Sequence, residues 1–280
     1  MAEPNAFGIA GLLGWPVAHS RSPVIHNHWI ARYGLSGRYV LFGVPPENVP
    51  AALRGISVLR LRGCNVTTPH KQAVIPLLDH VDPLARQIGA VNTIVVEEDG
   101  ALRGFNNDGN GFVQSVRDAK PGWEPGMGPI TLVGAGGAAR AIVASLGAQG
   151  AKEIRVVNRT YANAQALQAI FGPPVTAVRW EDREAALEGV TLVANATTQG
   201  MAGKPALDLA LTRLPRSAIV GDVIYVPPET PLLAAARARG NLTVNGLGML
   251  LNQARPAFHA WFGVMPEITP ELVRAVEATF

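Results

Sequence analysis

Residues 130–141 read ITLVGAGGAARA, and the expected fold class follows from this stretch. It begins as a short β-branched and apolar run, which is typical of a buried parallel strand. A glycine-rich turn follows. Apolar residues then recur at helical spacing at Ala139, Ile142, Val143 and Leu146. The stretch therefore predicts a strand, a tight turn and a helix, which is the beginning of a βαβ unit.

The segments on both sides extend this pattern. Downstream, EIRVVNRT, VTLVANAT and SAIVGDVIY are strand-like, and YANAQALQAIFG is helix-like. Alternation of strands and helices indicates a doubly wound parallel sheet. In the first 110 residues we expect strands at AFGIAGLLG, RYVLFGV and GCNVTT, and a hairpin at AVNTIVVEEDGALRGFN that turns at EDG. SPVIHNHWIARYG and PENVPAALRGI favour helices. The fold class is α/β.

Proline and glycine cluster at 117–129, RDAKPGWEPGMGP, where apolar periodicity stops. We expect two α/β domains around a cleft: a first domain at 1–112 and a Rossmann domain at 113–247. The spacing alone leaves open whether the helices in 248–280 pack back on the first domain, and we expect that they do. One of them contains Pro256, which removes a hydrogen bond and should bend its axis. The last begins at Thr269, a suitable N-cap.

Composition restricts the class of protein. The chain has 280 residues, 48% of them hydrophobic and 16% charged, which suffices for large cores. No apolar run approaches the roughly 18 to 20 residues of a membrane span, and MAEPNAFGIAGLLGWPVAH lacks the basic start of a secretory signal. The single cysteine fits a reducing compartment, so we expect a cytoplasmic protein. The net charge is +3 without a dense basic run, which argues against a nucleic-acid partner.

The glycine-rich turn predicts a dinucleotide site. Gly134, Gly136 and Ala139 form a GxGxxA pattern between strand and helix, which permits a tight turn, close approach of a pyrophosphate and close helix packing. The alternative is a purely structural turn. The next strand ends in Asn158, Arg159 and Thr160 rather than in an acidic residue. A guanidinium can pair with a 2′-phosphate, so NADP is favoured over NAD, unless Arg159 is only a solvated loop residue.

Polar residues in the first domain are candidates for chemistry. Ser20 and Ser22 could grip one carboxylate if the stretch is extended, although Ser22 suits a helix N-cap equally well. His26 and His28 do not face each other on a helix, which disfavours a metal site.

Further polar residues stand near expected strand ends. Asn92, Asn107 and Asp108 are such residues. Lys71, at the end of NVTTPHK, is another candidate. From the residues alone, Lys71 is as a rule a solvated lysine and Asp108 a turn residue. A Lys71–Asp108 pair is one candidate among others.

Taken together and in order, HSRSP, NVTTPHK, GAVNT, NNDG, VGAGGAARA, NRT, NATTQGM, DVIY and NGLGMLLNQA closely resemble the shikimate dehydrogenase family. The resemblance extends from about Gly14 to Gly263. It implies that the first domain and the C-terminal helices bind shikimate or 3-dehydroshikimate, and that the middle domain binds NADP(H). It also implies NADP-dependent reduction of 3-dehydroshikimate in the biosynthesis of chorismate and aromatic amino acids.

The resemblance also implies residue roles. Lys71 and Asp108 match the catalytic pair. The residues that match substrate contacts are Ser20, Ser22, Thr67, Lys71, Asn92, Asp108, Tyr225 and Gln253. The residues that match cofactor contacts are Gly134, Ala135, Gly136, Gly137, Ala138, Ala139, Asn158, Arg159, Thr160, Thr197, Val223, Gly246 and Met249. No metal is implied, and a homodimer is compatible with the sequence.

Several positions depart from the family pattern. Asn107 stands where Thr is common, and Asn163 stands where a second phosphate-binding Arg often follows NRT. Asn245 replaces a common Asp, and Pro256 replaces a residue that favours helix. These departures leave open a quinate or quinate/shikimate dehydrogenase with relaxed NAD/NADP use. A regulator that kept the fold and lost the chemistry is disfavoured because Lys71 and Asp108 are both present.

Overall fold

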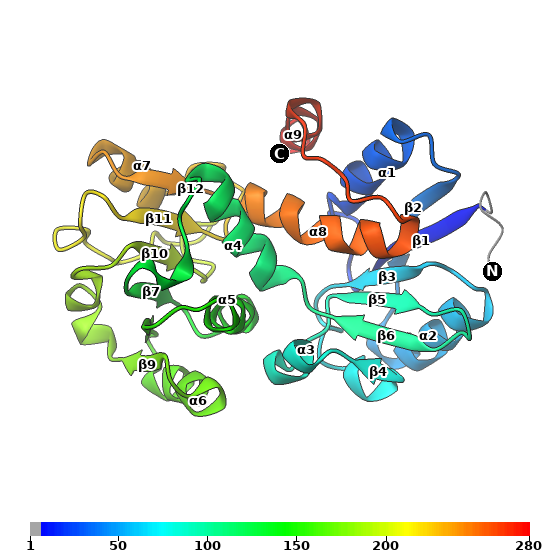
Figure 1. Ribbon diagram of the computed structural model, residues 1–280, viewed down its shortest axis with the longest axis horizontal. Helices are drawn as coiled ribbons and strands as arrows, with labels where there is room; N and C mark the ends of the chain where they lie inside the picture. The colour runs from blue at the N-terminus through cyan, green and yellow to red at the C-terminus, as the bar shows by residue number, and fades with distance from the viewer. Residues whose placement is uncertain (1–6) are drawn as a thin grey trace. The chain divides into compact units, whose positions relative to one another are not determined.

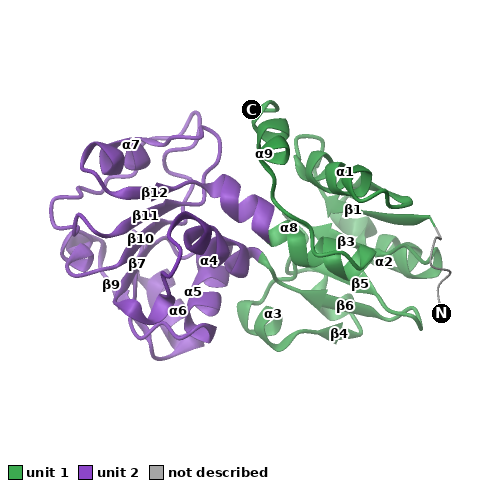
Figure 2. Ribbon diagram, turned by 45° about the horizontal axis from the view of Figure 1, so that its top comes forward, with its two compact units in different colours: residues 1–107, 253–280 green, residues 108–252 purple. Residues whose placement is uncertain are grey.

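The computed structural model describes residues 7–280, so the first part of the N-terminal stretch used against a secretory signal lies outside the described residues. The chain divides into two compact units (Figure 2). Unit 1 comprises Met1–Asn107 and Gln253–Phe280, and unit 2 comprises Asp108–Asn252. The boundaries thus differ from those expected at 112/113 and 247/248.

The physical reason for the earlier boundary lies in helix α4 (Asp108–Ala119). Phe112 and Val113, in its first two turns, are buried in the core of unit 2. The helix therefore belongs to unit 2 from its start, and the proline–glycine cluster at 117–129 lies inside that unit.

Unit 2 is built on a six-stranded parallel sheet with the order β12-β11-β10-β7-β8-β9. Its strands are β7 (Ile130–Val133), β8 (Ile154–Val157), β9 (Val175–Val178), β10 (Leu192–Asn195), β11 (Ile219–Asp222) and β12 (Leu242–Val244). The strand order reverses between β7 and β10. Ligands of such sheets bind outside the carboxyl ends of the strands at this switch point.

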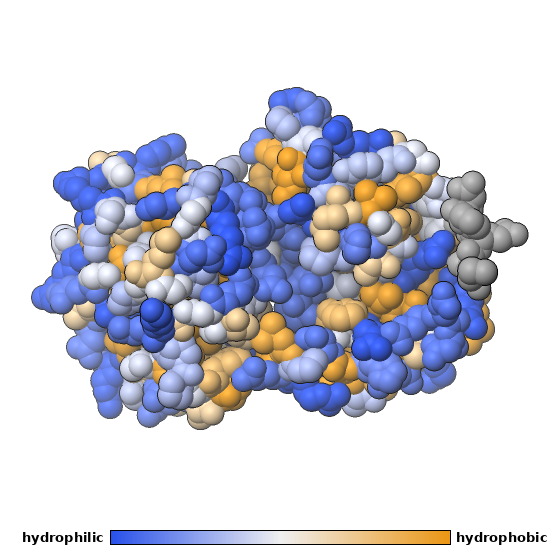
Figure 3. Space-filling model, in the orientation of Figure 1, coloured by the Kyte–Doolittle hydropathy of each residue, from blue (hydrophilic) through white to orange (hydrophobic). Residues whose placement is uncertain are grey.

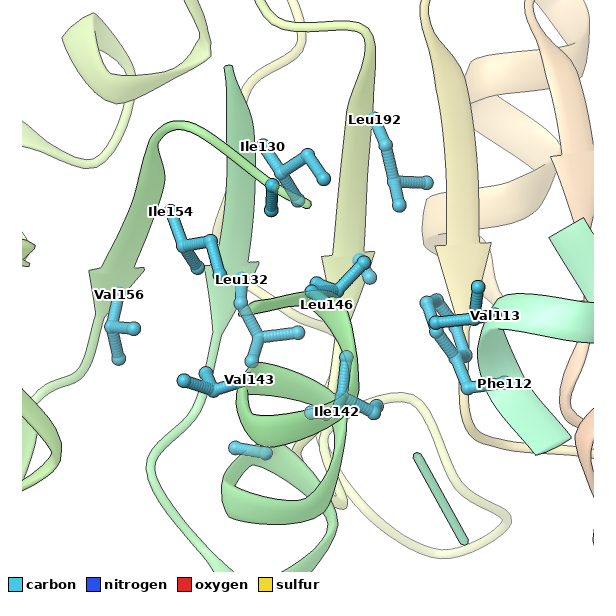
Figure 4. Packing of buried hydrophobic residues seen from close by; sticks show 14 of the residues in the cluster. Phe112, Val113, Ile130, Leu132, Ile142, Val143, Leu146, Ile154, Val156 and Leu192 are labelled. Carbon is cyan, nitrogen blue, oxygen red and sulfur yellow. The ribbon is translucent and has the colours of Figure 1, made fainter. Parts of the chain in front are cut away.

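Both faces of this sheet are covered, as the near-continuous apolar strands require. Its helices besides α4 are α5 (Gly137–Ala148), α6 (Tyr161–Phe171) and α7 (Pro231–Ala238) (Figure 1). Leu132 points into the core shared with α4, α5 and α6, whereas the next residue, Val133, packs with α7 on the opposite face. In Figure 4, Ile142 and Leu146 of α5 pack against the side chains of the sheet. The predicted doubly wound Rossmann sheet is confirmed.

Unit 1 carries a mixed sheet with the order β2-β1-β3-β5-β6-β4. Its strands are β1 (Gly8–Gly14), β2 (Gly37–Gly43), β3 (Gly63–Val66), β4 (His80–Val81), β5 (Thr93–Val96) and β6 (Leu102–Phe105). Strand β1 lies parallel between β2 and β3, and β5 pairs antiparallel with both β3 and β6. The β5–β6 pair is the hairpin that the sequence predicts.

The helices of unit 1 cover the two faces of this sheet. They are α1 (Ser22–Arg32), α2 (Val49–Val58), α3 (Pro83–Ile88), the C-terminal part of α8 (Gly246–Phe262) and α9 (Pro270–Glu277). Leu53 of α2 and Ala85 of α3 join one core with residues of β1 and β3. An aromatic cluster of His26, Tyr39 and Trp261 forms another.

Two features of the C-terminal helices follow from their residues. Thr269 caps α9 by accepting a hydrogen bond from the Leu272 N–H, as predicted. Helix α8 continues through Pro256, whose missing N–H removes one helical bond, and the two units divide within this helix, after Asn252.

Hydrophobic side chains form separate patches among polar ones on the face drawn in Figure 3. No helix in residues 7–280 combines the length and the hydrophobicity needed to cross a bilayer. Within the same residues, no three His, Cys, Asp or Glu side chains gather closely enough to hold a metal ion.

Candidate active site

The two serines between β1 and α1 lie side by side in unit 1. The Ser20 hydroxyl is 3.2 Å from that of Ser22, and it also accepts a hydrogen bond from the Ser22 N–H. Ser22 is nearly buried, and Ser20 is half-buried. Helix α1 begins at Ser22 with Arg21 as its N-cap residue, so the N-cap interpretation of Ser22 is wrong. The pair can present two hydroxyl donors to one anion.

The NVTTPHK segment leaves β3 as a compact turn. The Thr67 N–H donates to the Leu13 carbonyl, and the His70 N–H donates to the Thr67 carbonyl. The buried imidazole of His70 contacts the Val44 carbonyl at 2.7 Å, which anchors the turn. Lys71 is half-buried, and its carbonyl accepts a hydrogen bond from the Val91 N–H. The backbone of Lys71 is thereby tied to the residue before Asn92.

A buried polar network holds Asn92. The Asn92 Oδ1 accepts from the Thr93 hydroxyl and from the Asn107 N–H, and its Nδ2 donates to Gln253 Oε1 at 3.3 Å. Asn65, on β3, donates to the Asn92 carbonyl and to the Thr93 hydroxyl. Substrate residues expected from distant parts of the sequence, Asn92 and Gln253, are therefore directly bonded.

The network extends from Asn65 to Tyr39 on β2. The Tyr39 hydroxyl donates to Asn65 Oδ1 at 2.7 Å. Burial raises the pKa of Tyr39 well above its ordinary value, Cys64 adds to this effect, and a hydrogen bond with Ser22 partly offsets it. The phenol therefore stays neutral and remains a hydrogen-bond donor to Asn65.

Asp108 is the first residue of α4 and the first residue of unit 2. It directly follows Asn107, whose side chain donates to the Thr93 hydroxyl. Asn107, which stands where Thr is common, thus has a defined structural role in the network. The pairing of Asp108 with Lys71 stays a prediction.

The glycine-rich turn of unit 2 fits a dinucleotide phosphate. Gly134 has a φ of +117°, and a Cβ there would lie 2.9 Å from the Ala196 carbonyl oxygen, so only glycine fits without strain. A Cβ on Gly136 or Gly137 would meet nothing within 4 Å, which leaves open space before the N-terminus of α5. That N-terminus has no side-chain cap and no acidic residue in its first turn. Its amide groups and partial positive charge therefore favour a phosphate.

The remaining residues of this loop support the same geometry. Ala139 is fully buried against the sheet, which explains the small residue at this position, and Ala135 packs at the edge of the same core. Ala138 is half-buried in the first turn of α5.

The carboxyl end of β8 carries the predicted 2′-phosphate residues. The Asn158 side chain donates to the Thr160 carbonyl at 2.8 Å, which shapes the turn into α6. Arg159 and Thr160 are exposed, and no ion pair holds Arg159 within residues 7–280. An exposed guanidinium without a carboxylate partner is suited to an anionic ligand. The residues present therefore fit NADP.

A second buried network shapes the loops after β10 and β11. Asp222 is buried and accepts hydrogen bonds from the Asn195 side chain, the Ile224 N–H and the Thr230 hydroxyl. Burial raises the pKa of the Asp222 carboxyl, and these three bonds partly offset the rise. Asn195 also accepts from the hydroxyl and the N–H of Thr197. The network thus fixes Thr197, which the family resemblance assigns to the cofactor.

Val223 and Tyr225 stand on the loop after Asp222, beside the start of α8. A Cβ on Gly246 would lie 2.1 Å from the Val223 carbonyl oxygen, so this close approach requires glycine. Asn245 accepts from the Leu247 N–H and donates to the Pro228 carbonyl. An ionised aspartate could accept the first bond but could not donate the second. Met249 packs at the edge of the unit 2 core.

Reasoning from the sequence missed several positioning residues. Tyr39, Asn65 and Thr93 connect the substrate residues of unit 1, and Asp222 with Asn195 holds the loops of unit 2. The available signal was a polar residue inside an otherwise apolar strand. Such a residue must find hydrogen-bond partners when buried, but the sequence does not show which ones.

Comparisons with known proteins agree with this arrangement. Residues 12–94 match the family described as shikimate dehydrogenase substrate binding domain, and residues 126–203 match shikimate / quinate 5-dehydrogenase. A curated protein named shikimate dehydrogenase (NADP(+)) from Paramagnetospirillum magneticum is 51% identical over 264 residues, which cover 94% of this chain and 96% of that protein.

Two solved structures extend the comparison. Shikimate 5-dehydrogenase from Thermus thermophilus in complex with NADP(H) and shikimate has a TM-score of 0.86 and 35% identity, covering 98% of this chain and 100% of that chain. Quinate dehydrogenase from Corynebacterium glutamicum in complex with NAD has a TM-score of 0.87 and 32% identity, covering 97% and 98%. Since family matches fall in both units and the similarity extends along nearly the whole sequence, the chain belongs to the shikimate dehydrogenase family.

Proposed function

We propose that this protein is an NADP-dependent shikimate dehydrogenase, an oxidoreductase that reversibly reduces 3-dehydroshikimate to shikimate. The observation that carries the proposal is the bonded polar network of unit 1, which joins Tyr39, Asn65, Asn92 and Gln253, together with the adjacent hydroxyls of the serine pair. A small ring that bears a carboxylate and several hydroxyls needs many fixed donors and acceptors of this kind. The curated relative carries the same name at 51% identity.

Substrate binding is divided among these groups. Ser20 and Ser22 bind the carboxylate, because two adjacent hydroxyls can both donate to it. Thr67, Asn92 and Gln253 bind the ring hydroxyls, and Tyr225 is a further substrate contact in this proposal. The network behind Asn92 fixes which of its amide atoms donates, and therefore fixes its orientation toward the ring.

Reduction of the substrate carbonyl requires a hydride on carbon and a proton on oxygen. NADPH, when bound, supplies the hydride. In the proposal, Lys71 as an ammonium donates the proton to the carbonyl oxygen, and in shikimate oxidation Lys71 as an amine accepts it. Asp108 orients Lys71 and the substrate hydroxyl. The pH–rate profile of kcat for the Asp108→Asn variant measures how the proton role divides between the two residues.

Arg159 supports the assignment of NADP. It follows the strand next to the glycine-rich turn and has no carboxylate partner within the described residues. Asn158 and Thr160 shape its turn, and Gly134, Gly136 and Gly137 leave room for the pyrophosphate.

A steady-state assay that crosses shikimate and quinate with NADP and NAD tests the function. We expect the highest kcat/KM for shikimate with NADP. The absence of shikimate turnover with either cofactor would refute the proposal, and a preference for quinate with NAD would assign the chain to the alternative activity.

The proposal also covers the location of the enzyme in the cell and its oligomeric state. The single cysteine and the mildly positive charge without a basic run support a cytoplasmic enzyme that acts on a small anion, not on nucleic acid. A homodimer is proposed as its assembly, and the molar mass from light scattering on the purified protein tests this against the 29.5 kDa of one chain.

A further inference from the structure

The register of the unit 2 sheet brings a second arginine beside the NRT turn. Strands β8 and β9 pair in parallel, and their last partners are Val157 and Val178. Asn158 and Arg179 are the next residues, so both follow the carboxyl ends of their strands. Neighbouring parallel strands lie about 4.8 Å apart. Arg179 has an extended backbone, with φ −68° and ψ 152°, so it continues the direction of β9.

An aromatic contact holds Arg179 at these strand ends. Its guanidinium carbon lies 4.6 Å from the centre of the Tyr161 ring. Tyr161 is the first residue of α6 and directly follows Thr160. A guanidinium that stacks on a ring keeps the N–H groups along its edge available for a planar or tetrahedral anion. The contact therefore keeps Arg179 close to the turn that carries Arg159.

Arg179 also has no carboxylate partner among the described residues. Arg179 is exposed and, within residues 7–280, forms no ion pair, whereas Arg183 in the same segment pairs with Asp208. Glu181 follows it closely but does not pair with it. Helix α6, whose sequence is YANAQALQAIF, contains no lysine or arginine. Arg179 is thus a second cation, beside Arg159, at the carboxyl ends of β8 and β9.

We propose that Arg179, held by Tyr161, binds the 2′-phosphate of NADP(H) together with Arg159 and thereby determines the choice between NADP and NAD. The proposal rests on the proposed function, because it takes the NRT turn as the 2′-phosphate site. The group that these residues would bind is a phosphate monoester on a ribose, to which two guanidinium groups can donate several charge-assisted hydrogen bonds. Tyr161 is a positioning residue that acts through Arg179.

Calorimetric titration of the full chain with 2′,5′-ADP and with 5′-AMP tests the proposal without catalysis, since these probes differ only in the 2′-phosphate. We expect Arg179→Ala to weaken 2′,5′-ADP about 10-fold, as loss of a charge-assisted bond predicts, and 5′-AMP by less than about 2-fold. Arg179→Lys should recover part of the loss. Tyr161→Phe should behave as the unchanged protein, whereas Tyr161→Leu should weaken 2′,5′-ADP selectively.

Arg213→Ala is the matched control, because Arg213 pairs with Glu188 before β10 and so lies near the amino ends of the strands. It removes one positive charge and should leave both affinities unchanged. Equal weakening of both probes by Arg179→Ala, or no weakening, would overturn the inference while the unchanged protein still prefers 2′,5′-ADP. If the unchanged protein does not prefer 2′,5′-ADP, the assignment of NADP fails as well.

Discussion

His26 makes the stability of unit 1 depend on pH. The imidazole is fully buried, stacks on Tyr39 at 4.1 Å and lies edge-on to Trp29. Burial lowers the pKa of His26 from 6.5 to about 3, and a weak contact with Asn65, which is not a hydrogen bond of standard geometry, offsets this only in part. The folded chain therefore keeps a neutral imidazole at pH values where the unfolded chain binds a proton.

The sign and size of the effect follow from linkage. A lowered pKa in the folded state gives stability that is fully present above pH 6.5 and is lost as the pH falls toward 3. The loss is about 1.4 kcal/mol per pH unit within this window, or about 2 kcal/mol between pH 7 and pH 5. The ionisable groups beside the ring do not titrate there, since burial raises the pKa of Cys64 to about 12 and that of Tyr39 well above 10.

The test compares the protein with His26→Phe, which keeps an aromatic ring against Tyr39 and removes the titration. Urea unfolding followed by tryptophan fluorescence at pH 7, 6 and 5 gives the free energy of unfolding, with Trp29 and Trp261 as probes next to His26. The difference between the two proteins should change by about 2 kcal/mol over this range. His259→Gln, at an exposed position, should follow the unchanged protein. A pH-independent difference for His26→Phe would refute the reasoning.

Three further predictions concern the two sites. Lys71→Ala should lower kcat by about 10² or more with little change in NADPH affinity, whereas Lys204→Ala, at an exposed position, should keep kcat. Stopped-flow kinetics measures kcat, and equilibrium titration measures the NADPH affinity. A near-normal kcat for Lys71→Ala would exclude the catalytic role of Lys71. Gly134→Ala should destabilise unit 2 by more than Gly150→Ala, because both glycines have positive φ but only the first is crowded, at 2.9 Å; equal changes in the urea midpoint would contradict this. Asp222→Ala should lower the free energy of unfolding by on the order of 3 kcal/mol, because it removes the acceptor of three buried hydrogen bonds, and Asp222→Asn should lower it less. Equal decreases for the two variants would show that the charge of Asp222, and not its hydrogen-bond geometry, matters.

The sequence by itself determined the type of several main elements, although not of α4, α7 or β9, and the class of the cofactor site. The alternation around residues 130–141 predicts the doubly wound sheet, because buried parallel strands need apolar residues on both faces. The same local rules predict the β5–β6 hairpin and the cap of α9 at Thr269. Such features depend on neighbours in the chain, so local chemistry is enough to find them.

Only the tertiary structure decided which distant residues meet. Asn92 bonds to Gln253, and Tyr39 to Asn65, across separations that no local period encodes. The register of β8 and β9 places Arg179 beside the NRT turn, although the residue stands alone in the sequence. The boundary before Asp108 was also decided by packing, since the first turns of α4 are buried in the core of unit 2. Pairing between strands and burial of helix faces depend on the whole fold, and for that reason the chain shows the components of a site but not their contacts.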